Sequence, residues 1–170
     1  SKEFIAVATL RADAIFGTTN LWVNPKEDMI KIEVDGQIWI TSKEAQVKLE
    51  HQFDNVKLIS EHKGKEFVGL NAITPLIGRE VIIAEASFLD AKHGTGLAYS
   101  SPAGSPHDFL GLQKAKEEGR LPKDLEVINT VTTKDKKGNI ISYDASCPAE
   151  AKLKKFGIKD DEDKKLEDAK

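Results

Sequence analysis

The sequence predicts a mainly β fold with peripheral helices, built on a closed or strongly curved β-barrel core. Expected strands outnumber expected helices by about two to one, and an Asp35-Gly36 dipeptide between two alternating segments is typical of a tight hairpin. A chain of 170 residues, 39% of them hydrophobic, has the size of one domain and can fill one core. We therefore expect residues 1–170 to form a single domain.

The expected strands are short apolar runs or segments with period-two alternation. The first, residues 4–10, is a nearly continuous apolar run and predicts a strand covered on both faces. The hairpin pairs residues 30–34 with residues 37–40 across the Asp-Gly turn. The remaining expected strands are residues 56–60, 67–70, 80–84, 96–100, 127–132 and 139–143, the last two joined across Lys136-Lys137-Gly138.

Three helices are predicted from capping signals. Thr41 and Glu44 have capping-box spacing, and the apolar residues Ala45, Leu49 and Phe53 follow at every fourth position as one stripe facing the core.

The second and third helices have Pro near their start and Gly after their end. The second opens at Ser105-Pro106 and closes at Gly119, and the third spans residues 148–156 with Gly157 as its stop. Residues 160–170 also start like a capped helix, but Leu166 and Ala169 are their only apolar residues, so we expect this tail to bury little and the chain to have been excised from a longer protein.

Charge and motif content exclude several classes of protein. With 25 Lys and Arg against 28 Asp and Glu the net charge is −3, which gives no bulk sign of a nucleic-acid partner. No apolar stretch approaches the roughly 18 residues of a membrane span, and the single cysteine, Cys147, can form neither an intrachain disulfide nor a cysteine zinc cage. We expect a soluble, cytoplasmic protein without a membrane partner.

Motifs for metal or nucleotide chemistry are missing from the sequence. The four histidines, at positions 51, 62, 93 and 107, lack the spacing that places two imidazoles on one helix face, so we expect no metal site. A Walker loop, a dinucleotide-binding glycine fingerprint and a GxSxG elbow are also lacking. Up to this point the sequence predicts only a β-rich domain.

Two longer segments are more informative. Residues 8–25 read ATLRADAIFGTTNLWVNP, a strand that leads into a threonine-rich bend, and residues 94–108 read GTGLAYSSPAGSPHD, a strand that leads through a loop into a helix. Together they resemble the editing domain of class I aminoacyl-tRNA synthetases for branched aliphatic amino acids, and within that group the archaeal and eukaryotic type of leucyl-tRNA synthetase. Shorter segments, WITSKEA at 39–45, GIK at 157–159 and DKKL at 163–166, resemble the same family.

The resemblance implies post-transfer proofreading. An aliphatic pocket gains only about 1–3 kcal/mol from one methylene, and in this family a second site hydrolyses the ester of mischarged tRNA-Leu that carries Ile, Val, Met or a similar amino acid. The implied partners are the tRNA-Leu 3′ end, its aminoacyl-adenosine moiety and the remainder of the synthetase. No cofactor is implied for editing, and ATP and Mg would serve the parent synthetase outside this chain.

The resemblance assigns catalytic positions to Asp108 and Thr9. Asp108 occupies the place of the acid that holds the α-ammonium group of the bound amino acid, although an acid there also favours a helix N-terminus. The Thr9 hydroxyl would position the ester carbonyl and the attacking water, whereas its alternative role is a bond to its own backbone. Leu10 and Arg11 join the expected substrate-binding residues, with Arg11 holding either the tRNA 3′ end or Asp13.

The second motif contributes further substrate-binding positions. Gly94, Thr95 and Gly96 would let the backbone approach the terminal adenosine, although glycines beside a strand are often only bulges or turns. Ser101 and His107 of this motif and Ala14 of the first motif complete the expected substrate-binding set.

Two departures from the family pattern bear on function. Ala14 stands where the family has a threonine that keeps the leucyl side chain out of the hydrolytic pose, and Ser101 stands where an apolar residue is common. The alternative hypothesis is therefore a degenerate module that binds the aminoacylated 3′ end with little hydrolysis, and a third is a purely structural domain. A modest basic group, Lys114, Lys116, Arg120 and Lys123, is either a tRNA contact or a solvated helix face.

Overall fold

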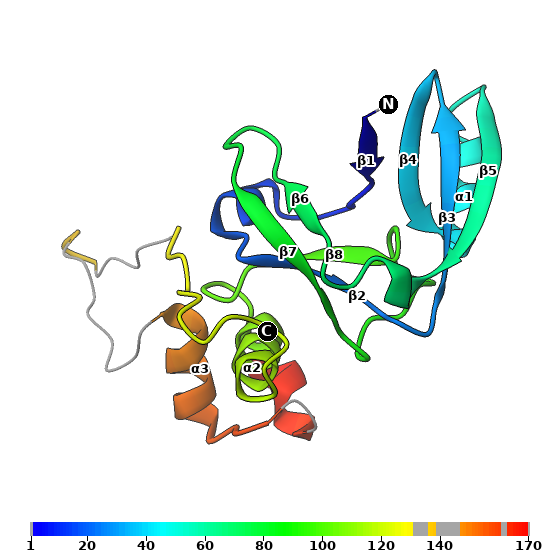
Figure 1. Cartoon of the computed structure of the whole chain (residues 1–170). Coiled ribbons are helices and arrows are strands. Elements are labelled where there is room, and N and C mark those ends of the chain that lie inside the picture. The colour runs from blue at the N-terminus through cyan, green and yellow to red at the C-terminus, as the bar shows by residue number, and fades with distance from the viewer. Residues whose placement is uncertain (1, 131–135, 139–146, 161–162, 170) are drawn as a thin grey trace. The chain divides into compact units, whose positions relative to one another are not determined.

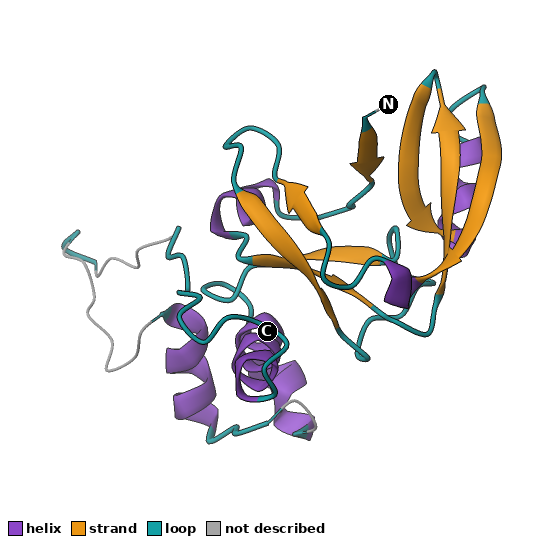
Figure 2. Ribbon diagram, in the orientation of Figure 1, coloured by secondary structure: helices purple, strands orange, loops and turns teal. Residues whose placement is uncertain are grey.

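The computed structural model describes residues 2–130, 136–138, 147–160 and 163–169. It separates into two compact units. Unit 1 comprises Ser1–Arg11 and Asn20–Tyr99, and unit 2 comprises Ala12–Thr19 and Ser100–Lys170. Figure 2 shows that nearly all strands belong to unit 1 and that helices dominate unit 2.

The first sheet of unit 1 has the order β1-β4-β3-β5 (Figure 1). Its strands are β1 (Glu3–Ile5), β3 (Asp28–Val34), β4 (Gln37–Ser42) and β5 (Val56–Lys63). β1 is parallel to β4, and the other two pairs are antiparallel. The expected hairpin is confirmed, since Val34 pairs with Gln37 and both Asp35 (φ 48°) and Gly36 (φ 79°) adopt the positive φ of a type I′ turn.

The second sheet has the order β6-β7-β2-β8. Its strands are β2 (Asn20–Val23), β6 (Asn71–Ile73), β7 (Glu80–Glu85) and β8 (Leu97–Ser100). β6 runs antiparallel to β7, and β2 runs parallel to β7.

The predicted barrel is wrong. A barrel requires the first and last strands of its sheet to pair, yet among the described residues one sheet ends at β1 and β5 and the other at β6 and β8. β1 and β6 each have only three residues. The fold is a mixed α+β arrangement of two open four-stranded sheets.

Several expected strands are shorter than predicted or do not form. The run at residues 4–10 is a strand only to Ile5, and β1 is largely exposed rather than covered on both faces, because its pairing ends at the Ala6 N–H bond to Ile40 O (3.0 Å). Residues 67–70 are not a strand, because they follow the 3-10 turn η2 (Gly64–Glu66) and Phe67 enters the core. Residues 127–130 form no strand, and residues 131–132 and 139–143 lie outside the described residues.

The core of unit 1 has two parts. Side chains from both sheets meet in one cluster, and its buried members are Leu21, Val23, Met29, Ile40, Phe67, Val81, Ile83 and Leu97. Ile30, Ile32 and Val34 point to the opposite face of β3 and pack with Leu49 of α1 (Lys43–Glu50). β3 thus contributes buried side chains to both clusters.

The N-cap of α1 is Ser42 rather than the predicted Thr41. Ser42 Oγ accepts the N–H of Ala45 at 3.2 Å. Thr41 instead pairs with Ile30 in the sheet, and its hydroxyl donates to Thr95 O at 3.2 Å. Thr41 therefore belongs to the hairpin, and the helix cap lies one residue later than the capping-box spacing predicts.

Unit 2 contains η1 (Ala12–Gly17), α2 (Pro106–Glu117), α3 (Pro148–Phe156) and η3 (Lys164–Ala169). The predicted helices opening at Ser105-Pro106 and spanning residues 148–156 are confirmed, and Gly157 ends α3 in the left-handed region (φ 67°). Their buried faces share one cluster with Leu166, which is 2% exposed. The expectation that the C-terminal tail buries little is therefore wrong at this residue.

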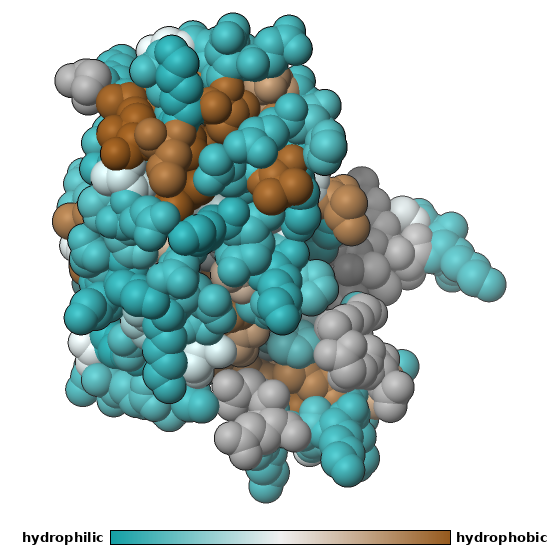
Figure 3. Space-filling model, turned by 90° about the vertical axis from the view of Figure 1, so that its right-hand side faces the viewer, coloured by the Kyte–Doolittle hydropathy of each residue, from teal (hydrophilic) through white to brown (hydrophobic). Residues whose placement is uncertain are grey.

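Apolar side chains also remain at the surface. Figure 3 shows one face on which brown apolar side chains gather among teal polar ones. Exposed large apolar residues in the described chain include Phe4, Val47, Leu58, Ile59 and Ile73. No helix among the described residues has both the length and the apolar character needed to cross a bilayer.

Candidate functional site

Asp108 lies in the first turn of α2, and two hydrogen bonds fix it. Its N–H donates to Oγ of the N-cap residue Ser105 at 3.3 Å. Its carboxylate Oδ2 accepts the N–H of Ser101 at 3.0 Å. The carboxylate thereby closes the loop that leads from β8 into α2, while it also lies where the helix dipole favours an anion.

Ser101 connects Asp108 to the threonine-rich bend within unit 2. Its hydroxyl donates to the carbonyl oxygen of Ala14 at 2.8 Å, and Thr18 Oγ1 donates to the same oxygen at 2.9 Å. The structure therefore joins three predicted site residues, Ala14, Ser101 and Asp108, in one hydrogen-bonded row.

Close packing holds the end of η1 beside the same loop. A Cβ built on Gly17 would lie 3.1 Å from Ser101 Oγ. The Thr19 N–H donates to Ser100 O at 3.0 Å. The bend and the loop are thus in contact at successive residues, and a larger side chain at position 17 would push them apart.

Thr9, Leu10 and Arg11 follow β1 in unit 1 and are exposed. Thr9 Oγ1 accepts the N–H of Arg11 at 3.1 Å and lies 3.2 Å from Arg11 O, to which it donates. This is the local backbone-bonded arrangement that the sequence left open as the alternative role of Thr9.

Gly94, Thr95 and Gly96 also lie in unit 1, beside the start of the threonine-rich motif. A Cβ on Gly94 would lie 3.8 Å from Cβ of Ala8. Gly96 has φ +80°, and a Cβ there would lie 2.5 Å from Cβ of Ser42. Gly96 is therefore required by close packing against the start of α1, whereas Gly94 (φ +61°) has ordinary space around it.

Thr95 Oγ1 is buried and has no hydrogen-bond partner among the described residues, although native structures pair most buried polar atoms. Thr95 and Gly94 line a pocket of about 490 Å³, together with Ala8, apolar side chains of β1, β4 and α1 that include Trp39, and Phe53 after α1. A pocket of this size suits a small organic ligand, and the Thr95 residue that lines it carries this unpaired hydroxyl.

The remaining titratable groups near the motifs offer no metal site. Among the described ranges no group of three or more His, Cys, Asp or Glu side chains is arranged to hold a metal ion. His107 is half-buried in the first turn of α2. Burial raises the pKa of the Tyr99 phenol above its ordinary value, so this side chain of β8 stays protonated at neutral pH.

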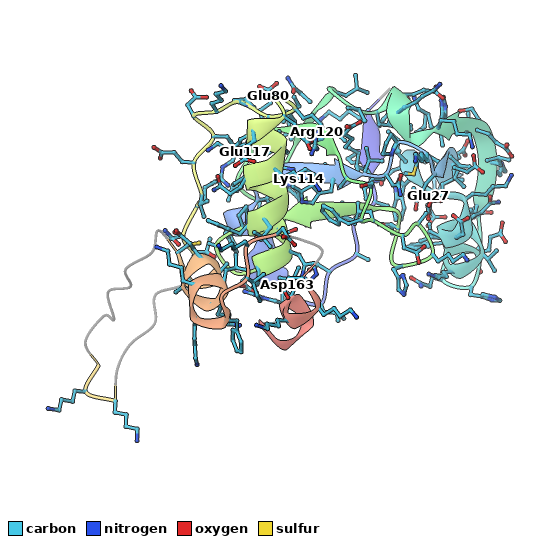
Figure 4. The ribbon with its side chains drawn as sticks, turned by 90° about the horizontal axis from the view of Figure 1, so that it is seen from below. Glu27, Glu80, Lys114, Glu117, Arg120 and Asp163 are labelled. Carbon is cyan, nitrogen blue, oxygen red and sulfur yellow. The ribbon has the colours of Figure 1, made fainter. Side chains whose placement is uncertain are left out.

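The basic group expected on and after α2 is partly engaged within the protein. Figure 4 shows Lys114, Glu117 and Arg120 along and just beyond α2. Lys116 Nζ donates to Leu125 O at 2.8 Å, and the Arg120 guanidinium bonds Glu118 Oε2 at 2.5 and 2.7 Å. Acidic neighbours therefore offset part of the positive charge.

The family described as leucyl-tRNA synthetase, editing domain, matches residues 1–162. The chain belongs to this family. Leucine–tRNA ligase of Methanothermobacter thermautotrophicus is 34% identical over 98% of the chain and 18% of its own length. That of Pyrococcus horikoshii is 34% identical over 98% and 18%, and that of Staphylothermus marinus is 42% identical over 68% and 12%. This editing domain thus spans less than a fifth of the ligases it matches.

Solved leucyl-tRNA synthetase editing domains share the fold. The cytosolic enzyme's editing domain from P. knowlesi superposes with a TM-score of 0.78 at 15% identity, covering 97% of this chain and 68% of the other. The corresponding P. falciparum domain has a TM-score of 0.76 at 16% identity, covering 96% and 63%. The resemblance that the two motifs indicated is therefore confirmed. The chain has the editing-domain fold, although its sheets do not form the predicted barrel.

The sequence did not point to Thr18 or Ser42 as organising residues. Both act through hydroxyl bonds to main-chain carbonyls, Thr18 to Ala14 O and Ser42 to Ala91 O (3.0 Å). For Thr18 a signal exists, because a threonine four residues after a helical carbonyl commonly bonds back to it.

Proposed function

We propose that this chain hydrolyses the ester of mischarged tRNA-Leu carrying Ile, Val, Met or a similar noncognate amino acid, within a leucyl-tRNA synthetase. The observation that carries this proposal is Asp108. Position 108 lies within residues 1–162, which match the family, and hydrogen bonds with Ser101 and Ser105 hold Asp108 in the first turn of α2. A carboxylate fixed by backbone geometry is suited to bind the α-ammonium group that all aminoacyl esters share.

The other predicted residues take further roles in the same proposed reaction. The Thr9 hydroxyl gives up its hydrogen bonds to the Arg11 backbone and bonds instead to the ester carbonyl and the attacking water. It thereby stabilises the charge that develops on the carbonyl oxygen. Leu10, Arg11, Ser101 and His107 contact the bound 3′ end. Water is the nucleophile, and the chain's own polar groups supply the rest of the chemistry.

The terminal adenosine binds against Gly94, Thr95 and Gly96. The pocket of about 490 Å³ beside Gly94 and Thr95 supports this placement, because its volume and aromatic lining suit a nucleoside. The unpaired Thr95 hydroxyl gains a partner when a polar atom of the nucleoside enters.

The whole-protein context belongs to the same proposal. Residues 1–170 act as one editing domain, and the remainder of the synthetase supplies most of the tRNA contacts together with the site that uses ATP and Mg. Editing itself needs no cofactor, and the enzyme works in the cytoplasm. The nearly balanced charge of the chain fits a domain that binds only the 3′ end of the tRNA.

A second candidate function is binding of the aminoacylated 3′ end with little hydrolysis. Ala14 in place of the family threonine favours it, because the side chain that excludes leucine is reduced to a methyl group. The Thr9 bonds to the Arg11 backbone favour it as well, since a hydroxyl already paired is less available to an ester.

Deacylation of Ile-tRNA-Leu separates these candidates. We expect hydrolysis by the chain, and a loss of roughly 10- to 150-fold in kcat/KM for Asp108→Ala, which corresponds to the about 1.5–3 kcal/mol of a charged hydrogen bond. Asp124→Ala, an exposed acid in the same unit, should be neutral. Binding of a non-hydrolysable aminoacyl-adenosine without any deacylation would favour the binding module, and indifference of both readouts to Asp108→Ala would refute the anchor.

Thr95→Val tests the adenosine position independently. The variant keeps the shape of the side chain and removes a hydroxyl that makes no protein hydrogen bond, so stability should hold or rise. Affinity for the aminoacyl-adenosine analogue should fall. Unchanged affinity would place the adenosine elsewhere.

A further inference from the structure

Ser60, His62 and Glu66 form a hydrogen-bonded row in unit 1 that the proposed editing function does not use. Ser60 Oγ lies 2.8 Å from His62 Nε2. His62 Nδ1 lies 2.9 Å from Glu66 Oε2. A hydroxyl within hydrogen-bond reach of a base, with the base oriented by a third group, is the arrangement that activates serine nucleophiles.

The acid end of the row determines where the protons lie. An ionised carboxylate can only accept, so His62 Nδ1 must carry the hydrogen that bonds Glu66. Nε2 is then the acceptor in the neutral ring, and the Ser60 hydroxyl donates to it. The hydrogen bond from His62 also lowers the pKa of Glu66 from its ordinary value, which keeps this carboxylate ionised at neutral pH.

Local structure fixes each member of the row. The β3–β5 register shifts between Lys31 and Ile32, so that Lys31 faces Ser60 while Ile32 faces Leu58. This bulge precedes Ser60, and Ser60 and His62 then share one face as alternate residues of the strand. Bulges of this kind often lie next to active sites, where they redirect a side chain.

Neighbouring contacts hold the base and the acid. The His62 ring packs edge-on against Phe67 with centroids 5.6 Å apart. Glu66 Oε1 accepts the N–H of Lys63 at 2.7 Å. β5 is an edge strand of its sheet, and the His62 side chain is 23% exposed, so a small molecule can reach the row from solvent.

We propose that Ser60, His62 and Glu66 form a nucleophilic site that accepts acyl groups from small activated esters. Ser60 Oγ attacks the ester carbonyl carbon, and its proton passes to His62 Nε2. The bond from carbon to the leaving aryl oxide breaks, and the aryl oxide takes that proton. Water then attacks the acyl-serine, Nε2 accepts a proton from the water and returns it to Ser60 Oγ, and the net products are a carboxylic acid and a phenol.

Labelling of the 170-residue chain with a fluorophosphonate tests the nucleophile. General-base assistance contributes about 10²–10⁴-fold, so mass spectrometry should find phosphonylated Ser60 at least ~100-fold faster than Ser87, an exposed serine of the same unit. p-Nitrophenyl acetate should acetylate the same residue. Equal labelling of Ser60 and Ser87 would overturn the proposal.

Variants of the base and the acid complete the test. His62→Gln keeps a polar side chain of similar length, and should reduce labelling of Ser60 to the Ser87 level with the melting temperature retained. Glu66→Gln should lower the rate about 10-fold, and Glu66→Asp should restore part of it, which loss of packing alone would not explain. Labelling by His62→Gln at the wild-type rate would refute the role of the base.

Discussion

A methyl group added at Gly96 should destabilise the protein more than one added at Gly94, although both glycines have positive φ. In Gly96→Ala the new Cβ would meet Cβ of Ser42 at 2.5 Å and its N and Cα at 3.3 Å. Ser42 has little freedom to move. Its N–H donates to Thr95 O at 2.7 Å, and its hydroxyl donates to Ala91 O at 3.0 Å while capping α1.

The expected magnitude has two parts. An L-residue in the left-handed region costs about 1–2 kcal/mol, and forcing an extra carbon into a packed site typically costs about 1–3 kcal/mol. Gly96→Ala should therefore lower the free energy of unfolding by about 2–5 kcal/mol. Gly94→Ala supplies the matched control, because its Cβ meets only Ala8 Cβ at the ordinary distance of 3.8 Å and the backbone part alone remains.

Urea unfolding followed by far-UV circular dichroism measures both variants, with m-values compared to check that the denatured states are alike. A Gly96→Ala variant that is no less stable than Gly94→Ala would refute the packing argument. Deacylation adds a second comparison. If the backbone of Gly94 approaches the adenosine as proposed, Gly94→Ala should lose activity beyond its modest loss of stability.

Three further predictions concern caps, pH and the core of unit 2. Ser105→Ala removes the hydroxyl that caps α2 and should cost about 1 kcal/mol in urea unfolding. The hydrogen bond from His62 lowers the pKa of Glu66 in the folded protein below its ordinary 4.5. The ionised carboxylate therefore stabilises the fold above that pH, and this stabilisation is lost as the pH falls through the folded-state pKa. The difference in urea midpoint between wild type and Glu66→Gln should consequently be smaller at pH 3 than at pH 7. Leu166→Ala at a site 2% exposed should cost about 2–5 kcal/mol, whereas Leu58→Ala at a site 47% exposed should change the melting temperature little.

Elements with a local chemical signal were predictable from the sequence. The Asp35-Gly36 turn needs two residues that tolerate positive φ, and Gly157 ends α3 for the same reason. The cap Ser105 likewise acts on an N–H three residues away. In each case the residues that decide the structure are neighbours in the chain.

The failures are non-local. Whether a sheet closes depends on which strands pair with one another. The run at residues 4–10 pairs with the edge of β4, and this pairing ends at residue 6. Phe67 has the apolar character of a strand residue, but it lies in a turn and packs into the core between the two sheets. The place of Asp108 in the first turn of α2 was predictable from the Ser105-Pro106 start signal, whereas its bond to Ser101 required the folded loop.

The anchoring of Ala14 by its carbonyl oxygen has a consequence for how this domain can evolve. Ser101 and Thr18 donate hydrogen bonds to the main-chain carbonyl oxygen of residue 14. Every amino acid has this oxygen, so a substitution at position 14 leaves both hydrogen bonds available. The resemblance places the steric stop against leucine at this same position. If position 14 contacts the amino acid as the resemblance implies, single substitutions there can change substrate choice while the loop that carries Asp108 keeps its hydrogen bonds.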